Sequence, residues 1–392
     1  MGTPEEILTK TLQEIATKEG INNCEFIIKQ LSSDGANYSS QIFNAKIVSP
    51  DRPELDLFAK VASVSEAFRT QMKVDRFYAI EGYVYHELVK KYMDIQEKYK
   101  VPEEDRFIFP KFYGSNANRS EETIVLENLT AQRYTMFDRF KSVTWEFASK
   151  SIEELAKFHA LSFAFKNEEP DVFPSNESTF NMTQTMSFDD FAVFAKTMDM
   201  MYAFLDKKLQ DRLRKFIDEN WTEASIAKYY GPWKWTVLAH GDYRPSNIMF
   251  KRQGGKVKSL VPVDYQTVRL SSPSTDLYYF IYSGTDEGFR KLHLKPLLNH
   301  YYATLSKFLT MFEMDPEIVF SRKDFDEDFK EMAPYGLITT MFLLPLVMVD
   351  PANAPKMSTE GADMANMMIT PSDAFKKRFI PTIEGFMKMG VL

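Results

Sequence analysis

A short polar stretch between two strand-like runs constrains the fold of this chain more than any other feature. The segment "VLAHGDYRPSNIMF" covers residues 237–250, inside a half of the chain whose pattern is otherwise mainly helical. His240 precedes Asp242 by two positions, and Asn247 follows Asp242 by five. A Gly-Gly pair shortly afterwards predicts a hairpin turn, and the second strand of that hairpin ends at Asp264 in "VPVDYQ". The chain must therefore fold so that a hairpin lies directly behind a polar loop.

The spacing H-x-D-x-x-x-x-N, followed by a hairpin and an Asp, matches the catalytic loop and the metal-binding Asp of protein kinases. Phosphoryl transfer from ATP needs a carboxylate to deprotonate the attacking hydroxyl, ligands for Mg²⁺ and a cation on the phosphates. Asp242 fits the base, and the side-chain oxygens of Asn247 and Asp264 suit a hard cation. His240 is expected to orient the loop without transferring protons. A plain polar turn is the alternative interpretation.

The N-terminal part predicts an antiparallel sheet. Three strand-like runs, "CEFIIKQL", "YSSQIFNAKIV" and "LDLFAKVA", are separated by turn residues. Lys60 ends the third run and is the expected cation on the phosphates. The long helix-like segment 68–100 follows and contains Glu81, which we expect to hold Lys60 in place. Glu66 and Glu87 are the competing partners for Lys60.

The nucleotide is expected to lie against two further segments. The loop "SDGANYSS" is predicted to turn over the phosphates with backbone N–H groups and small hydroxyls, and its candidate contacts are Gly35, Asn37, Ser39 and Ser40. No G-x-x-x-x-G-K-[ST] motif occurs, which excludes a Walker-type site. The run "IVLENL" is the predicted hinge, where adenine would bond to the backbone around Glu127 and Leu129; a plain edge strand is the alternative there.

Length and pattern together predict an α+β fold with two lobes. A chain of 392 residues is too long for one compact core. We expect a β-rich N-terminal lobe over residues 1–126, with a helix at its start. A mainly helical C-terminal lobe over 127–392 would contain the hairpin and the catalytic loop. This arrangement is a bilobal, protein-kinase-like fold.

Composition narrows the class of partner. The net charge of -7 argues against a nucleic-acid binder, because phosphate-backbone binding depends on an excess of Lys and Arg. Cys24 is the only cysteine, so no internal disulfide is expected. The first twenty residues lack the basic and apolar regions of a signal peptide, and no apolar run is long enough to span a bilayer. We therefore expect a cytoplasmic protein without membrane contact; the oligomeric state stays open.

Several features of the sequence differ from those of protein kinases. The motif His-Gly-Asp lacks the Arg that reads a phosphorylated activation loop, and only a few residues separate Asp264 from "SSPSTDLYYF". That short connection favours a small-molecule substrate. Asp276, at the start of an apolar helix, is predicted to brace the catalytic loop through backbone N–H groups. Arg244 is expected either to contact the γ-phosphate or to be solvated, and His159 to be a packed helix residue.

The motifs taken together resemble the ecdysteroid kinase-like family, a relative of choline kinases and aminoglycoside phosphotransferases. The similarity rests on "GANYSSQIFNAKI", "LFAKV", "FYAIEGYVYHEL", "IVLENL", "LAKFHALSF", "LAHGDYRPSNIMF" and "VPVDYQTVRLSSPSTDLYYF", and it runs from about Phe26 to Ser283. The resemblance implies a protein-kinase-like fold, ATP and Mg²⁺ as cofactors, and phosphorylation of a hydroxyl on a small organic molecule. The family's type activity implies an ecdysteroid or related apolar alcohol as acceptor.

The chain departs from the family pattern in places. Members commonly carry Trp directly after the catalytic Asp, where this chain has Tyr243, and often Phe where this chain has Tyr265. Residues 167–220, expected to help line the acceptor site, match no pattern. Two alternatives to an ecdysteroid kinase remain: a kinase that detoxifies foreign compounds, and a silent pseudokinase or carrier of apolar ligands. Retention of all five of the predicted catalytic, metal-binding and phosphate-positioning residues argues against the silent form.

Overall fold

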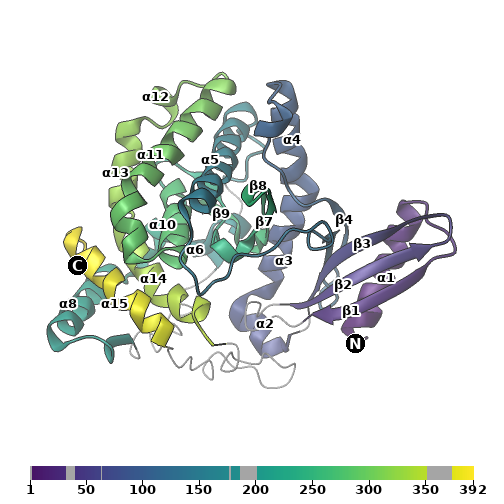
Figure 1. Cartoon of the computed structure of the whole chain (residues 1–392), viewed down its shortest axis with the longest axis horizontal. Coiled ribbons are helices and arrows are strands. Elements are labelled where there is room, and N and C mark those ends of the chain that lie inside the picture. The colour runs from purple at the N-terminus through teal and green to yellow at the C-terminus, as the bar shows by residue number, and fades with distance from the viewer. Residues whose placement is uncertain (1, 32–39, 63, 176–177, 186–200, 351–372) are drawn as a thin grey trace.

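An antiparallel sheet forms the N-terminal part of the chain (Figure 1). The computed structural model describes residues 2–31, 40–62, 64–175, 178–185, 201–350 and 373–392. Within these residues the sheet has five strands in the order β1-β2-β3-β5-β4, and every neighbouring pair is antiparallel. The strands are β1 (Glu25–Leu31), β2 (Gln41–Ser49), β3 (Arg52–Val61), β4 (Phe112–Asn116) and β5 (Thr123–Glu127).

The two faces of the central strand β3 serve different purposes. Leu57, Ala59 and Val61 are fully buried in a core beneath helix α1 (Pro4–Lys18), because alternate side chains of a strand point to the same face. Thr3 caps α1 through a reciprocal hydrogen-bond pair with Glu6, which fixes where the helix begins. Lys60 lies between two of these core positions and therefore points to the opposite face, away from α1.

A column of helices follows β3 and covers that opposite side. The pattern over 68–100 predicts one long helix, but the structure divides it, since Lys73 adopts a left-handed backbone with φ 53°. The chain turns there, so the helix that carries Glu81 begins as a separate element. The elements of the column are α2 (Glu66–Met72), α3 (Val74–Tyr83), the π-helical turn η1 (Val84–Leu88) and α4 (Val89–Lys98), followed by the 3-10 turn η2 (Glu103–Asp105).

The remainder of the chain is mainly helical, and α5 packs along α11 at its centre. Its helices are α5 (Trp145–Glu168), α6 (Met182–Thr185), α8 (Lys207–Asn220), α9 (Glu223–Tyr230), α10 (Pro273–Gly284), α11 (Glu287–Met311), α12 (Pro316–Val319), α13 (Arg322–Glu331), α14 (Ala333–Val347) and α15 (Asp373–Lys388). The 3-10 turns η3 (Ser178–Phe180), η5 (Pro245–Asn247) and η6 (Tyr265–Thr267) connect elements around the predicted catalytic loop.

Two small β units interrupt these helices, and one of them is the hairpin that the sequence predicts. Strand β6 (Val237–Ala239) pairs with β9 (Arg269–Ser271), and β7 (Ile248–Gln253) pairs with β8 (Lys256–Pro262). Gly254 and Gly255 join β7 to β8 with φ of 59° and 79°, a conformation that glycine adopts without strain. The predicted α+β class, with a β-rich first part and a helical second part, is confirmed.

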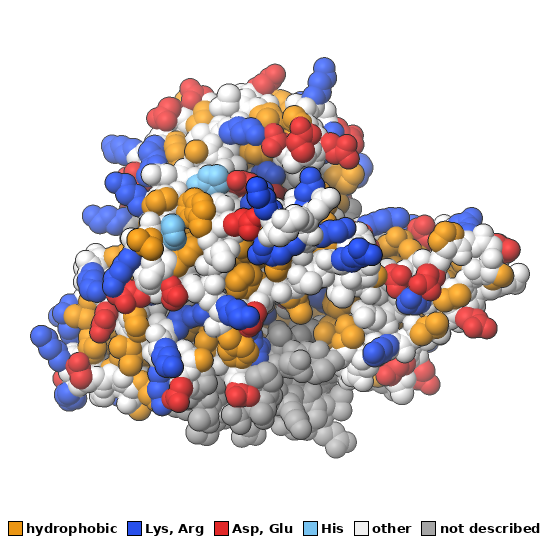
Figure 2. All heavy atoms as spheres, in the orientation of Figure 1, with side chains coloured by type: hydrophobic (Ala, Val, Ile, Leu, Met, Phe, Trp, Pro, Cys, Tyr) orange, Lys and Arg blue, Asp and Glu red, His pale blue; other side chains and the backbone are white. Residues whose placement is uncertain are grey.

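The largest apolar core crosses the predicted lobe boundary. Side chains from the helical column, such as Ile80 and Leu88, share one buried cluster with Leu155 and Phe158 of α5. The column therefore packs on the helical part as well as on the sheet. Figure 2 shows basic and acidic side chains interspersed over one face of the molecule. Within the described residues, no helix is both long and apolar enough to cross a membrane.

Candidate functional site

Lys60 joins the sheet, the helical column and the helical part at one point. Its ammonium donates to Glu81 Oε1 at 2.9 Å and Oε2 at 3.2 Å, and to Asp264 Oδ1 at 2.6 Å. Lys60 and Glu81 are both buried. Of the three acids that the sequence offers as partners, Glu81 is therefore the one that contacts Lys60. Glu66 instead forms an exposed ion pair with Arg119.

Lys60 and Asp264 hold each other in ionised form, whereas burial and the charge of Asp264 raise the pKa of Glu81 despite its contact with Lys60. Burial alone would lower the pKa of Lys60, but the carboxylates of Asp264 and Glu81 outweigh it and raise the pKa above its ordinary value. Burial would likewise raise the pKa of Asp264, but Lys60 holds it below the usual range. A charged Lys60 paired with an ionised Asp264 is thus the stable form of the site.

Asp264 reaches Lys60 because of an uncommon backbone conformation. It follows β8 and precedes η6 with φ 71° and ψ 63°, in the left-handed region. Only a small share of residues other than glycine adopts this region, and Asp is among those enriched there. The neighbouring Val263 is fixed by its N–H bond to Asn247 O (2.9 Å) and by His240 Nε2 at its carbonyl (3.2 Å). The position of the Asp264 carboxylate is therefore set by the catalytic loop.

Asp242 and Asn247 are joined directly. Asn247 Nδ2 donates to Asp242 Oδ2 at 2.8 Å and to Asp242 O at 3.0 Å. The short turn η5, which begins with Pro245, folds the loop back and makes this contact possible. Because the amide nitrogen faces Asp242, Asn247 Oδ1 is the atom left for another ligand.

The second oxygen of Asp242 is buried, and within the described residues no donor lies within 3.5 Å of it in hydrogen-bond geometry. Arg244 Nε lies 3.4 Å from Asp242 Oδ1, so the two side chains form an ion pair without a hydrogen bond between these atoms. Burial raises the pKa of Asp242, and the charge of Arg244 only partly offsets this. A buried carboxylate oxygen without a donor is costly, so its presence calls for a functional reason. An incoming hydroxyl group would supply the missing hydrogen bond.

His240 orients the catalytic loop through both nitrogens of its ring. Its Nε2 faces Val263 O, and its Nδ1 lies 3.3 Å from the Asp242 N–H. One neutral tautomer, with the proton on Nε2, satisfies both contacts. Burial lowers the pKa of His240, which favours that neutral form. The geometry thus suits the orienting role that the sequence predicts for His240.

Asp276 braces the same loop from the start of α10. Its Oδ2 accepts from His240 N–H at 2.6 Å and its Oδ1 from Gly241 N–H at 2.8 Å. His159 Nε2 lies 3.1 Å from Asp276 Oδ2, and Tyr301 OH lies 2.7 Å from His159 Nδ1. His159 is packed, as predicted, and it also links α5 and α11 to the brace.

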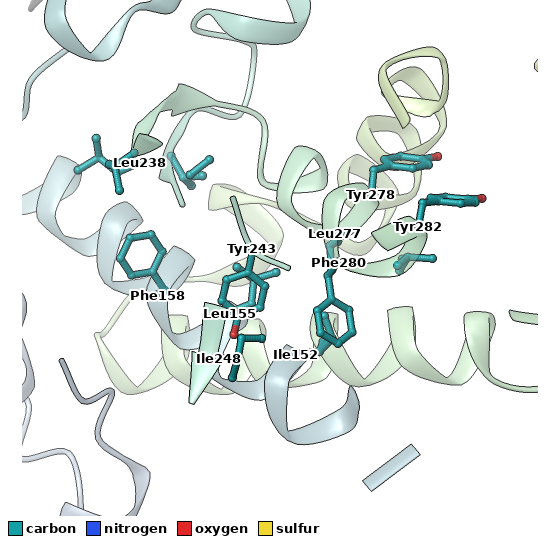
Figure 3. Packing of buried hydrophobic residues seen from close by; sticks show 14 of the residues in the cluster. Ile152, Leu155, Phe158, Leu238, Tyr243, Ile248, Leu277, Tyr278, Phe280 and Tyr282 are labelled. Carbon is teal, nitrogen blue, oxygen red and sulfur yellow. The ribbon is translucent and has the colours of Figure 1, made fainter. Parts of the chain in front are cut away.

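Tyr243 anchors the loop in the core. Its ring lies between α5 and α10, beside Phe158 and Phe280 (Figure 3). Its hydroxyl donates to Ser151 O at 2.7 Å, and its side chain is 1% exposed. The residue after Asp242 is therefore a large buried aromatic that holds the loop against α5 and α10.

Gly241 meets other elements so closely that no side chain fits. A Cβ at this position would lie 2.2 Å from Thr267 O and 2.4 Å from Arg269 Nη1, and its φ is 84°. Arg269 of β9 is buried beneath the loop, donates to Tyr335 OH at 3.0 Å, and has an Nε without a hydrogen-bond partner. Burial lowers the pKa of Arg269, but the neighbouring Tyr335 and Asp276 outweigh it and raise the pKa above its ordinary value.

The predicted nucleotide-binding residues are only partly described. Gly35, Asn37 and Ser39 lie outside the described residues. Ser40 lies at the start of β2 and accepts a hydrogen bond of 2.8 Å from Tyr78 OH. At the predicted hinge, Glu127 N–H donates to Lys111 O (2.8 Å), and Leu129 O accepts from two residues of the following turn.

The donor set fits a magnesium ion. In the described part of the chain, no group of three or more His, Cys, Asp and Glu side chains is placed to hold a metal. The predicted ligands are instead one amide, Asn247, and one carboxylate, Asp264. Such a sparse set suits Mg²⁺, which keeps several positions for water and phosphate oxygens.

Three residues of the site were not singled out from the sequence. Tyr301 completes the brace on Asp276, Arg269 fills the space under Gly241, and Tyr279 of α10 has a hydroxyl group whose interaction with Asp242 contributes to the pKa of that carboxyl. A charged residue within the apolar run "TVRLSS" was the available signal for Arg269. Tyr301 lies 142 positions from its partner and left no local signal.

Three comparisons with known proteins bear on this site. The family model of the ecdysteroid kinase-like family matches residues 34–314, which is well over half of the chain and includes every predicted catalytic and metal-binding residue. An uncharacterized kinase-like protein of Caenorhabditis elegans is 24% identical over 234 residues, covering 59% of this chain. The match also spans 59% of that relative's length.

One solved structure aligns with most of the chain at a low TM-score. The GDP complex of wild-type aminoglycoside 2'-phosphotransferase-IIIa aligns over 87% of this chain and 97% of its own, with 12% sequence identity and a TM-score of 0.40. At that score the likeness adds nothing to the assignment, which rests on the family match and on the motifs that carry it. The chain belongs to the ecdysteroid kinase-like family.

Proposed function

We propose that this protein transfers the γ-phosphoryl group of ATP to a hydroxyl of a small organic molecule, with an apolar alcohol such as an ecdysteroid as acceptor. The observation that carries the proposal is the buried Asp242 Oδ1, which lacks a hydrogen-bond donor while its partner oxygen is held by Asn247. A family match over 34–314 supports the kinase-like chemistry. We place the activity in the cytoplasm, in keeping with the expectation from the sequence.

Asp242 is the proposed base. Its Oδ1 accepts the proton of the acceptor hydroxyl as the oxygen forms a bond to the γ-phosphorus, and the bond to the bridging oxygen breaks to release ADP. The burial that raises the pKa of Asp242 makes it a stronger proton acceptor. Asn247 fixes the direction of the carboxylate, so the free oxygen keeps one orientation.

Lys60 and Asp264 are the proposed phosphate and metal ligands. Glu81 holds the Lys60 ammonium in place, leaving Lys60 able to neutralise phosphate oxygens. Mg²⁺, when bound, would offset the negative charge of the phosphate groups. The Asp264 carboxylate now pairs with Lys60 at 2.6 Å, and together with Asn247 Oδ1 it is the proposed ligand set for that ion. Arg244 is a proposed contact for the γ-phosphate from its place beside Asp242.

The remaining predicted roles belong to the same proposal. Backbone groups around Glu127 and Leu129 would bond adenine, and Ser40 would border the phosphates together with Gly35 and Asn37. The division into lobes at residues 126 and 127 also remains a proposal. A small acceptor is favoured because only η6 and β9 separate Asp264 from α10, which leaves no activation segment over the site.

The test is ADP release by the purified chain with ATP and Mg²⁺, against ecdysteroids, sterol glycosides, choline and aminoglycosides. We expect turnover with apolar alcohols, and a loss of about 10²- to 10⁴-fold in Asp242→Asn with nucleotide binding retained. Asp326→Asn, an exposed position on α13, is the matched control and should keep full turnover.

The panel separates the alternatives. Turnover confined to ecdysteroids supports hormone conjugation, whereas turnover on other hydroxyl compounds supports detoxification with the same mechanism. Undiminished turnover in Asp242→Asn would remove Asp242 as the base. A protein that neither binds ATP nor releases ADP, yet binds steroid, would be a carrier.

A further inference from the structure

A charged cavity lies where α2 meets α3, and none of its lining residues is one of the predicted catalytic or metal-binding residues. It has a volume of about 310 Å³ and is lined by Arg69, Thr70, Lys73, Asp75, Arg76 and Arg119. Figure 1 places α2 directly below α3, at the end of the helical column. Arg119 comes from the segment between β4 and β5, so the cavity joins the column to the sheet.

Two of the four cations in this cavity are already balanced by carboxylates. Arg69 is buried and pairs with Asp75 and with Glu122, to which its Nη2 donates at 2.9 Å. Arg119 pairs with Glu66 and, through Nε at 3.2 Å, with Asp75. These contacts position the wall of the cavity and leave its other cations uncompensated.

Among the residues that the structure describes, Lys73 and Arg76 have no acidic partner. In the described part of the chain, no ion pair reaches either side chain. Arg76 Nε donates to Thr179 O of η3 at 2.8 Å, but Arg76 Nη2 is buried without any hydrogen-bond partner. Burial lowers the pKa of Arg76 to about 10, and the charge of Arg269 adds to this effect.

A desolvated guanidinium such as that of Arg76, whose charged form a second cation disfavours further, is unfavourable unless an anion balances it. The same place offers further attraction for an anion, because α3 begins at Lys73 without a side-chain cap on its first N–H groups. Two uncompensated cations, an unpartnered buried donor and a cavity of this volume together describe a site for a small, highly charged anion.

We propose that this cavity binds a phosphate group through Lys73 and Arg76, either as inorganic phosphate or as a small phosphate ester. Phosphate oxygens would supply the acceptors that Arg76 Nη2 lacks. Arg76 also holds Thr179 in the helical part, and Glu81 lies on the same helix, about one and a half turns further on. Bound phosphate therefore steadies α3 and with it the contact between Glu81 and Lys60.

The test is calorimetric titration of the full chain with inorganic phosphate, and in parallel with glycerol phosphate, at constant ionic strength. The titrations are made without nucleotide and then with a saturating non-hydrolysable ATP analogue and Mg²⁺. We expect one phosphate per chain, bound in both conditions. Lys73→Gln and Arg76→Gln should each weaken binding at least tenfold. Lys90→Gln removes a 76%-exposed cation on α4 and should leave it unchanged.

The outcomes of these titrations distinguish inorganic phosphate from a phosphate ester and show which results would overturn the proposal. Equal affinity for both probes supports free phosphate as the ligand, and tighter binding of glycerol phosphate supports an ester. Absence of binding, or binding that Lys73→Gln leaves intact, overturns the proposal. So does loss of binding in the presence of the ATP analogue, because the ion would then lie in the cleft at Lys60. Binding of the ATP analogue itself reports on the proposed kinase activity separately.

Discussion

Asp242 and Asp276 are both buried near one loop, yet their surroundings give them opposite properties. Asp276 accepts two backbone N–H groups. Burial would raise the pKa of Asp276, but the hydrogen bond with His159 and the nearby basic groups together hold it below its usual range. Asp242 has one bonded oxygen and one without a donor, and burial raises its pKa. Carboxylates whose pKa values are pushed apart typically divide the roles of a site. Asp276 is thereby suited to hold the loop, and Asp242 to accept a proton.

A third buried carboxylate, Asp328, makes the stability of the fold depend on pH. Burial raises the pKa of Asp328 to about 6, although Ser272 and Ser274 hydroxyls donate to its Oδ2. Because this pKa lies above the unfolded value near 3.8, the folded state binds the proton more tightly. The stability that this group gives is complete below about pH 4 and is lost as pH rises through 6.

Asp328→Asn should therefore stabilise the protein at neutral pH relative to wild type, by up to about 3 kcal/mol, and the difference should shrink toward pH 4. Urea unfolding at several pH values between 4 and 7 measures it. Asp326→Asn on the same helix, whose side chain is 58% exposed, should run parallel to wild type. Parallel curves for Asp328→Asn and wild type would show that Asp328 does not titrate in this range.

At the scale of elements, one segment from β8 to α10 positions most of the site. Asp264 follows β8, Arg269 lies in β9, and Asp276 lies in the first turn of α10, all within 13 residues of one another. Several residues of the segment bond to the catalytic loop, for example Thr267 Oγ1 to His240 O at 3.1 Å, and these bonds fix the segment against the loop. Its position in turn depends on what packs behind α10.

Gly336 of α14 lets that packing form. A Cβ at Gly336 would lie 2.1 Å from the ring of Tyr278 on α10. Gly336→Ala should therefore push α14 away from α10 and lower the free energy of unfolding by about 1–3 kcal/mol. Thermal or denaturant unfolding measures the change.

Gly82→Ala is the matched control for Gly336→Ala. Gly82 lies in α3 and has a helical backbone, and a Cβ added there would have no other atom within 4 Å beyond its own helix. Alanine there should be neutral or stabilise the chain by about 0.5–1 kcal/mol, since it reduces the freedom of the unfolded chain. An equal loss of stability in both variants would contradict the packing argument at Gly336.

At the scale of the whole molecule, the Lys60–Asp264 ion pair joins residues that lie 204 positions apart. Lys60 belongs to the sheet, whose core under α1 is separate from the large core of the helical part. The pair thus links two packed bodies at the place where the nucleotide phosphates are proposed to bind. Ligands that engage Lys60 and Asp264 together should stabilise the whole chain.

A non-hydrolysable ATP analogue with Mg²⁺ should raise the melting temperature. At a hundredfold excess over Kd, the added stability is about 2.7 kcal/mol. Asp264→Asn should remove most of the Mg²⁺-dependent part of this rise, because an amide is a poorer ligand for a hard cation. Differential scanning fluorimetry with and without Mg²⁺ makes the comparison. Asp211→Asn is the control, because the Asp211 side chain on α8 is 58% exposed. An unchanged Mg²⁺ effect in Asp264→Asn would take Asp264 out of the metal site.

Local chemistry in the sequence predicted much of this protein. Alternating apolar residues and turn residues predicted the antiparallel sheet, and a Gly-Gly turn predicted the β7–β8 hairpin; both are confirmed. The family was recognised from short motifs, and the family match confirms it. These features were readable because each depends on residues close together in the chain. The catalytic and metal-binding roles of Asp242, Asn247 and Asp264 remain predictions.

Only the tertiary structure decided which distant groups meet. Glu81 rather than Glu66 contacts Lys60 because the left-handed turn at Lys73 gives α3 its own direction. The same turn leaves Arg76 without an acidic partner, which no local pattern reveals. His159 holds the catalytic loop through Asp276, 117 positions away. Such contacts depend on how buried faces pack, and packing is a property of the folded chain as a whole, whereas the sequence pattern records only which side chains are available to it.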